Sequence, residues 1–150
     1  MSPSVWLQRS EPEPGGPVSV ALRMASDISE VEAAVELMAD HCFAGLDPCD
    51  RTKFRLRVAL SEALSNAILR GNLEDRDKRV SVRAELFPET IRLEIADEGN
   101  GFDVPRTVPA TLPNSVDDEC GRGLFIIRHL ADRVEFNDQG NTIWMTLPRC

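Results

Sequence analysis

Asp97, Gly99 and Gly101 form a short polar motif that follows directly on the alternating apolar run 91–95. An acidic side chain at the end of a buried strand, followed at once by glycines, lets the backbone turn sharply and approach a flat ligand closely. We interpret the motif as a ligand-binding turn. Taken alone, the motif is also compatible with a solvated loop that binds nothing, because Asp, Asn and Gly also dominate ordinary turns.

Glu62 and Asn66 lie four residues apart in the segment 50–69, which is expected to be a helix. Its apolar residues recur at the helical period: Leu56, Ala59, Leu60, Ala63, Leu64, Ala67 and Ile68. The carboxylate and the amide project from one side, at the border of this stripe, where they can meet a ligand between helix and sheet. An exposed polar pair, or an ion pair between Glu62 and Arg55, is the alternative.

A third motif, Gly121, Arg122, Gly123 and Leu124, stands immediately before the apolar segment 125–131. That segment is expected to be a helix. Glycines at a helix start leave backbone N–H groups accessible, and the helix dipole favours an anion there. Arg122 can add a charged donor to a phosphate. A helix entry under a turn explains the glycines nearly as well.

The remaining periodic segments predict the elements that must position these motifs. Alternating apolar residues at 18–24, 80–86 and 91–95 predict strands, and so do the runs 134–136 and 142–147. The strands 80–86 and 91–95 are expected to form one hairpin, and the strands 134–136 and 142–147 a second. Asp27 and Glu30 resemble a capping box, which opens a helix with one apolar face: Ile28, Val31, Val35, Met38 and Cys42. Hairpin strands separated by helices predict an α+β two-layer sandwich, with one mixed, mostly antiparallel sheet and three helices on one face. A Rossmann arrangement is disfavoured, because strands and helices do not alternate one for one.

Two proline-containing segments lack either period. Residues 1–16 are expected to be a flexible N-terminal arm, or a strand added at a sheet edge. Residues 104–120 are interpreted as a mobile lid, with plain disorder as the alternative, because long irregular loops inside compact domains are uncommon unless they bind something.

Composition limits the functional classes. With 150 residues, 42% of them hydrophobic, the chain fits one domain with a real core. A formal net charge of -8 argues against direct binding of nucleic acid or of an anionic membrane. The sequence shows no signal peptide and no apolar run long enough to span a bilayer, so a cytoplasmic protein is expected. The four cysteines have no C-x-x-C spacing and are expected to be reduced thiols.

The three motifs occur in a fixed order that resembles the N, G1 and G2 boxes of the GHKL-type ATP-binding fold. The resemblance covers about residues 17–148, and we assign 17–150 to one such domain. Gyrase-type topoisomerases and histidine kinases share this fold. The run 61–67, Ser-Glu-Ala-Leu-Ser-Asn-Ala, is most similar to the anti-sigma-factor serine kinases of bacteria.

The resemblance implies a nucleotide role for several residues. Asn66 would ligate Mg²⁺ through its amide oxygen. Asp97 would accept a hydrogen bond from the exocyclic amine of adenine, and Gly99 and Gly101 would let the chain pass close to the nucleoside. Thr142 would support the network on the adenine side. The implied cofactors are therefore ATP and Mg²⁺.

The resemblance also implies phosphoryl transfer. Gly121, Arg122, Gly123 and Leu124 would cradle the phosphates. Glu62 would orient or deprotonate a serine hydroxyl of a protein substrate. The expected function is that of a kinase that phosphorylates a STAS-type anti-anti-sigma partner and sequesters a sigma factor when that partner is unavailable. The alternative is a nucleotide-dependent partner-switching module without phosphoryl transfer. Because members of the resembled family commonly form homodimers, a homodimer is also expected.

Overall fold

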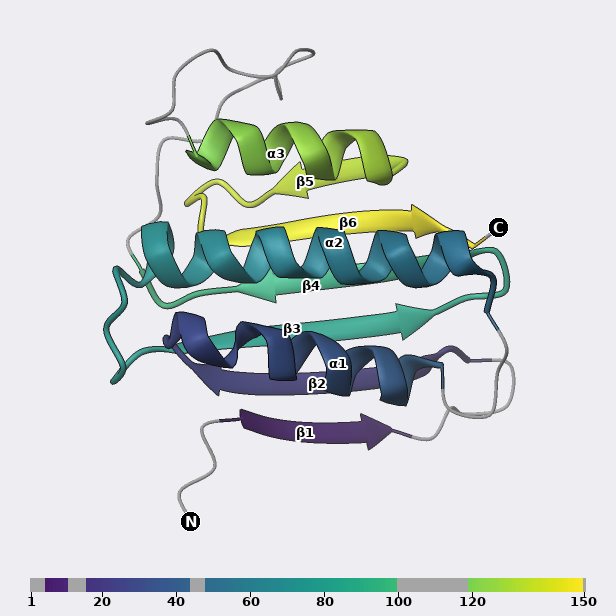
Figure 1. The fold of residues 1–150 in the computed structure, drawn as a ribbon, viewed down its shortest axis with the longest axis horizontal. Helices are drawn as coiled ribbons and strands as arrows, with labels where there is room; N and C mark the ends of the chain where they lie inside the picture. Colours follow the sequence, from purple (N-terminus) through teal and green to yellow (C-terminus); the bar gives the residue numbers. More distant parts are fainter. Residues whose placement is uncertain (1–4, 11–15, 44–47, 100–118, 150) are drawn as a thin grey trace.

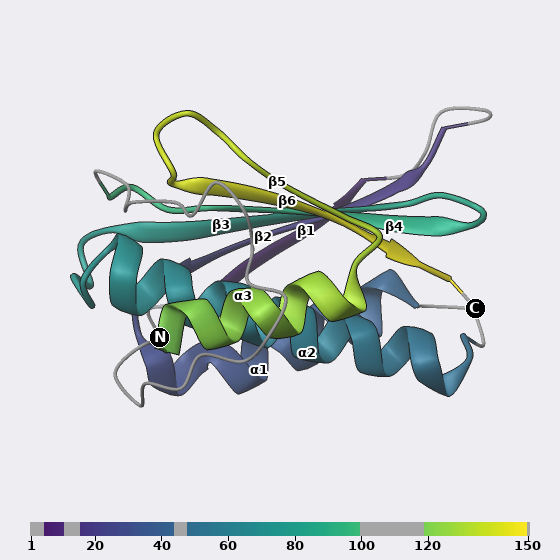
Figure 2. The ribbon, with the colours of Figure 1, turned by 90° about the horizontal axis from the view of Figure 1, so that it is seen from above.

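A computed structural model describes residues 5–10, 16–43, 48–99 and 119–149. They form a two-layer α/β sandwich in which three helices cover one face of a single sheet (Figure 1). Figure 2 shows the same arrangement from above, with the three helices on one side of the strands. None of the helices that the structure describes combines the length and the apolar content needed to cross a membrane. The expected sandwich architecture is confirmed.

The sheet has six strands in the order β1-β2-β3-β4-β6-β5, and every described pair is antiparallel. The strands are β1 (Val5–Ser10), β2 (Val18–Ala25), β3 (Arg79–Leu86), β4 (Thr90–Ala96), β5 (Arg133–Phe136) and β6 (Thr142–Pro148). The two predicted hairpins, β3–β4 and β5–β6, are present. Residues 5–10 pair with β2 as an edge strand, which is one of the two alternatives that composition left open.

The apolar residues that alternate along the predicted strands are the residues that are buried in the structure. Apart from the half-buried Val18 at the start of β2, the residues of β2, β3, β4 and β6 that face the helices are at most 8% exposed: Val20, Leu22, Met24, Val80, Val82, Ala84, Leu86, Ile91, Leu93, Ile95, Ile143, Met145 and Leu147. The opposite face carries charged pairs such as Arg83 and Glu94, which lie across from each other in the β3–β4 register. One face of the sheet therefore belongs to the core and the other does not.

The helices are α1 (Val31–Cys42), α2 (Asp50–Asn66) and α3 (Glu119–Leu130), with a 3₁₀ turn, η1 (Ile28–Glu30), before α1. The apolar stripe predicted for the second helix is buried throughout. Ile28, expected on the buried face of the first helix, is 44% exposed. The reason is local: Asp27 caps the 3₁₀ turn rather than α1, so α1 starts three residues later and Ile28 lies off its apolar face.

Two helix boundaries differ from prediction. The α-helical part of α2 ends at Asn66, and the chain continues as a π-helical turn, η2 (Ala67–Gly71). Helix α3 begins at Glu119 instead of after the glycines, so Gly123 lies inside the helix. The proposed lid, 104–120, falls almost wholly on residues 100–118, outside the described part of the chain.

The cysteines differ from one another. Cys42 is buried in the core and keeps its thiol. Cys49, which precedes α2 and accepts a hydrogen bond from the Thr52 N–H through Sγ at 3.4 Å, belongs to a disulfide bond. The prediction of reduced thiols is therefore wrong for Cys49.

Candidate functional site

The π-helical turn begins immediately after Asn66 and shapes one wall of the site. The Asn72 N–H donates to the Ala67 carbonyl at 2.8 Å, which is the i→i−5 bond of a π turn. Such single turns occur often at functional sites, because the extra residue redirects the chain. Here the turn carries Gly71 against Asp97.

The turn after β4 packs on Gly71 too closely for any side chain at either glycine. A Cβ on Gly71 would lie 2.3 Å from Asp97 Oδ2, and a Cβ on Gly99 would lie 1.9 Å from the Gly71 carbonyl oxygen. The turn is also held by hydrogen bonds. The Asp97 N–H donates to the Asn141 carbonyl at 2.9 Å, and the Gly99 N–H donates to Asp97 Oδ1 at 2.8 Å. The Asp97 carboxylate therefore has a fixed position, with Oδ2 accepting no hydrogen bond from any described residue.

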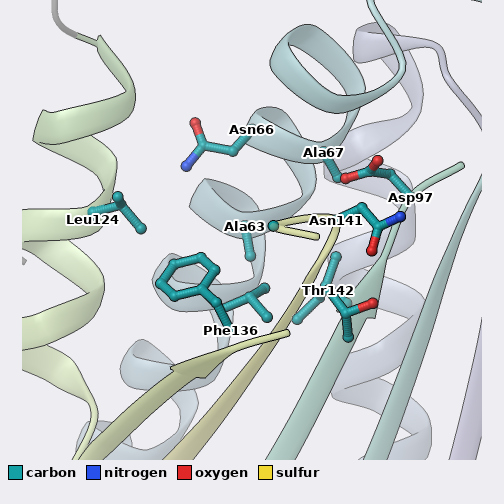
Figure 3. Close-up of a pocket in the computed structure, with 11 residues that line it drawn as sticks. Ala63, Asn66, Ala67, Asp97, Leu124, Phe136, Asn141 and Thr142 are labelled. Atoms are coloured by element: carbon teal, nitrogen blue, oxygen red, sulfur yellow. The ribbon is translucent and has the colours of Figure 1, made fainter. Parts of the chain in front are cut away.

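A pocket opens between α2, α3 and the ends of β4 and β6. Its wall is formed by Ala63, Asn66, Ala67, Ile95, Asp97, Leu124, Phe136, Gly140, Asn141, Thr142 and Ile143. In Figure 3, Asn66 and Leu124 face each other across one part of the pocket, and Asp97 lies beside Ala67 and Asn141. Mostly apolar walls with one carboxylate and two amides suit a flat, partly polar ligand.

The Asp97 carboxylate is half-buried in this pocket. Burial raises its pKa above the usual value, and the Gly99 N–H and the charge of Lys78 offset part of that rise. A carboxylate with limited access to water forms stronger hydrogen bonds with a ligand donor than an exposed one does.

Glu62 and Asn66 meet at Gly123 of α3. A Cβ on Gly123 would lie 2.9 Å from Glu62 Oε2 and 3.2 Å from Asn66 Nδ2. The absence of a side chain at this position therefore lets α3 approach both polar groups. Burial raises the pKa of the Glu62 carboxyl. The predicted alternative, an ion pair with Arg55, is absent, since Arg55 donates instead to the Pro148 carbonyl at 3.5 Å.

Asn66 Nδ2 is buried and has no hydrogen-bond partner, the one such side-chain atom among the described residues. The oxygen and nitrogen of a side-chain amide are interchangeable in assignment, and turning this amide would leave an oxygen in the same place without a donor. Unsatisfied buried polar atoms are rare in folded proteins and call for a missing partner. No described residues form a cluster of three or more His, Cys, Asp or Glu side chains. One amide oxygen suits Mg²⁺, which takes most of its ligands from water and phosphates.

The structure brings part of the predicted site together. Asn66, Asp97, Leu124 and Thr142 line one pocket, and Gly99 lies at its edge against Gly71. Leu124 contributes its buried side chain to the pocket. It does not offer a free backbone N–H, because only the first four residues of a helix have N–H groups without a partner inside the helix, and Leu124 lies beyond them.

The other predicted residues lie elsewhere or are not described. Glu62 borders a second, open groove between α1 and α2, and reaches the pocket only through Asn66 and Gly123. Gly121 and Arg122 belong to the first turn of α3, and their side chains are not described. Gly101 lies outside the described residues.

Sequence reasoning missed Gly71, Asn72 and Asn141. Gly71 and Asn72 lie just after the predicted helical segment 50–69, and Asn141 directly precedes the run 142–147. A Gly-Asn pair straight after a helix that already carries two candidate site residues was the available signal.

The sequence is similar to known proteins along most of its length. The model of the histidine kinase-like ATPase domain family matches residues 14–147. The serine-protein kinase RsbW of Bacillus subtilis (strain 168) is 36% identical over 98 residues, which is 61% of each chain. RsbW of Staphylococcus aureus (strain Newman) is 32% identical over 98 residues, 60% of this chain and 62% of that protein. The aligned part thus spans about three-fifths of the length of these relatives. Because the family model matches most of the sequence, the chain belongs to the histidine kinase-like ATPase domain family.

Proposed function

We propose that this chain binds ATP in the pocket of Asp97 and Asn66 and transfers the γ-phosphate to a serine of a protein partner. The observation that carries the proposal is the meeting of Glu62, Asn66 and Gly123. A carboxylate whose pKa is raised by burial lies beside the Asn66 amide, whose Nδ2 is buried without a partner, and Asn66 lines the pocket. The relatives named serine-protein kinase support the choice of serine.

The adenine half of the site follows from Asp97. Its Oδ1 is occupied by the Gly99 N–H, which leaves Oδ2 to accept a hydrogen bond from the exocyclic amine of the base. Ile95, Ile143 and Phe136 supply the apolar walls that a flat ring needs. Thr142 would complete the polar contacts at the start of β6.

The phosphate half follows from Asn66 and the first turn of α3. Asn66 would hold Mg²⁺ through its amide oxygen, and the ion when bound supplies positive charge for the phosphate oxygens. Gly121 and Arg122 would contribute N–H groups and a guanidinium at the helix N-terminus. Gly123 lets α3 approach Asn66 without a side chain between them.

Glu62 would act as the general base. It accepts the proton of the serine hydroxyl while that oxygen bonds to the γ-phosphorus and the bond from phosphorus to the ADP oxygen breaks. A raised pKa suits this task, because a base is most effective when its pKa lies nearer the working pH. The groove between α1 and α2 opens beside Glu62 and gives a protein substrate access to the carboxylate.

The partners follow from the resemblance to the anti-sigma-factor serine kinases. The phosphoacceptor would be a STAS-type anti-anti-sigma protein, and the chain would sequester a sigma factor when that protein is unavailable. A homodimer and a cytoplasmic location remain predictions. An acidic chain with a net charge of -8 is expected to meet proteins rather than nucleic acid.

The test is transfer of label from γ-labelled Mg-ATP to the serine of a STAS-domain protein encoded near this chain. We expect wild-type protein to label the partner and Glu62→Ala to lower transfer by about 10²–10⁴-fold with little change in the Kd for ATP. Glu94→Ala is the matched control, since Glu94 is also half-buried but lies on the open face of the sheet.

Each result selects one function. If wild-type protein binds ATP but labels no STAS partner, the chain is a nucleotide-dependent switch without phosphoryl transfer. If Asp97→Asn leaves the Kd for ATP unchanged, the assignment of the nucleotide pocket is wrong. If Glu62→Ala transfers phosphate at the wild-type rate, another group acts as the base.

A further inference from the structure

Asn72 is 1% exposed, and every polar group that it carries is hydrogen-bonded. Its Nδ2 donates to Ser26 Oγ at 2.8 Å and to the Arg79 carbonyl at 3.1 Å, and its Oδ1 accepts from the Glu98 N–H at 2.8 Å. The backbone is used as well: its carbonyl accepts from the Asp75 N–H at 3.0 Å. Burying an amide costs free energy that only such complete pairing offsets, so this residue connects its surroundings with high specificity.

The side chain of Asn72 joins segments that the sheet does not join. The β3–β4 ladder ends at the pair Ser81 and Ala96, so the turn that follows β4 has no strand partner on the β3 side. In place of a strand partner, the Asn72 side chain accepts a hydrogen bond from the Glu98 N–H of this turn. The Glu98 carboxylate in turn accepts from the Arg79 N–H. The far end of Asn72 is anchored by Ser26, whose hydroxyl donates to the Lys78 carbonyl at 2.7 Å.

This anchor acts on the residue next to Glu98, which is Asp97. Asn141 holds the other side of the same turn, because its carbonyl accepts from the Asp97 N–H and its Nδ2 donates to the Gly99 carbonyl at 3.3 Å. Asn141 lines the pocket and would touch a ligand directly. Asn72 is absent from the pocket wall, and its hydrogen bond to the Glu98 N–H links it to the pocket through the neighbouring residue Asp97.

We propose that Asn72 is a positioning residue that fixes Asp97 for recognition of the 6-amino group of adenine, and thereby sets the preference for ATP over nucleotides with a 6-oxo group. The inference rests on the proposed ATP site. A site built to accept a hydrogen bond rejects a ligand that offers an acceptor in its place, because two acceptors then face each other. That rejection requires the Asp97 carboxylate to stay in place. A turn released from Asn72 lets Asp97 move away from the unfavourable contact, which weakens ATP binding more than ITP binding.

ATP and ITP are the probes, because inosine carries a 6-oxo group where adenosine carries the 6-amino group. The Kd of each is measured for wild-type protein and for Asn72→Ala. We expect Asn72→Ala to raise the Kd for ATP about tenfold, to change the Kd for ITP less than about threefold, and so to reduce the preference for ATP.

Ser26→Ala is the matched control. It removes one of the two acceptors of Asn72 Nδ2 while leaving the bond to the Glu98 N–H in place, so we expect lower stability with the ATP/ITP preference within about twofold of wild type. Asn72→Asp keeps an acceptor for the Glu98 N–H and is expected to retain most of the preference. If Asn72→Ala does not fold, Asn72→Ser replaces it, because the shorter hydroxyl loses the bond to Glu98 but remains polar.

The outcomes separate this inference from the proposed function. If the substitution of Asn72 weakens ATP and ITP binding by the same factor, Asn72 only stabilises the fold and the positioning role is overturned. If wild-type protein binds the two nucleotides equally, the adenine site itself is wrong, and the role of Asn72 falls with it.

Discussion

Two asparagines six residues apart show how the two halves of this site differ. Asn72, on the adenine side, is fully hydrogen-bonded and joins the π turn, β3 and the turn after β4. Asn66, on the phosphate side, has a buried Nδ2 without a partner. The hydrogen bonds of the Asn72 side chain are all made within the protein, whereas Asn66 Nδ2 lacks a partner until a ligand is present.

The glycines show the same contrast. A Cβ on Gly99 would meet the backbone oxygen of Gly71 at 1.9 Å, and backbone cannot move without disturbing the turn. A Cβ on Gly123 would meet the end of the Glu62 side chain at 2.9 Å, and that side chain can rotate away. The adenine half is thus built rigidly in advance, whereas the phosphate half tolerates adjustment.

The largest expected effect is that of Gly99→Ala. Because the new methyl group collides with the Gly71 carbonyl, we expect the free energy of unfolding to fall by about 3 kcal/mol, with loss of ATP binding. Gly123→Ala is the matched control. Its contact is with a flexible side chain, and alanine favours a helix over glycine, so stability should stay within about 1 kcal/mol of wild type. Phosphoryl transfer should nevertheless drop in Gly123→Ala, because Glu62 is displaced. Urea unfolding followed by far-UV circular dichroism measures both stabilities, and equal losses would contradict the contrast between the halves.

The next effect separates the two asparagines. Asn72→Leu leaves the Ser26 hydroxyl, the Arg79 carbonyl and the Glu98 N–H without their partner, so we expect a loss of about 2–3 kcal/mol. Asn66→Leu removes an unsatisfied buried atom with little change of shape, and we expect a gain of about 1 kcal/mol without ligand.

The same pair of variants reports on the metal. In wild-type protein the Kd for ATP should be lower with Mg²⁺ than with EDTA, and in Asn66→Leu this difference should disappear. If Asn66→Leu is destabilised as much as Asn72→Leu, the Asn66 amide is already paired in the folded chain, and the proposed metal role loses its support.

The sequence was informative wherever periodicity encodes burial. Alternation located five of the six strands and both hairpins, and the helical stripe placed Glu62 and Asn66 at the border of the core, where the structure has them half-buried. These features follow from the pattern of apolar residues, which both local geometry and core packing require.

The sequence was uninformative where long-range packing decides. The residues Ala67–Gly71 contain nothing that distinguishes a π turn from a continued α-helix, and the contact of Gly71 with Asp97 joins segments far apart in the chain. The glycines of α3 suggested a helix start. Gly123 instead serves the close approach of α3 to α2. The disulfide of Cys49 likewise leaves no trace in cysteine spacing.

The smallest expected effect concerns Glu62 and pH. Burial raises the folded-state pKa of this carboxyl above its unfolded value, so the folded protein binds the proton more tightly than the unfolded chain does. The contribution of Glu62 to stability is therefore greatest below the unfolded pKa, declines as the pH rises through the folded pKa, and is constant above it. Glu62→Gln keeps the neutral form at every pH. We expect the variant to be more stable than wild type at pH 7, by less than about 1 kcal/mol because solvent screens part of the charge, and the two to converge near pH 4.

Urea unfolding at several pH values measures this difference, and Glu94→Gln, on the open face across from Arg83, controls for loss of a carboxylate. The same titration has a functional counterpart. Phosphoryl transfer by wild-type protein should fall as the pH drops through the raised pKa of Glu62, since only the ionised carboxylate can accept the serine proton. A stability gain in Glu62→Gln together with loss of transfer would show that the phosphate half keeps a costly buried charge because catalysis needs it. If Glu62→Gln is less stable than wild type at pH 7, the Glu62 carboxylate has a stabilising partner in the folded protein. The contrast between an adenine half whose polar groups are paired and a phosphate half whose polar groups are not is then wrong.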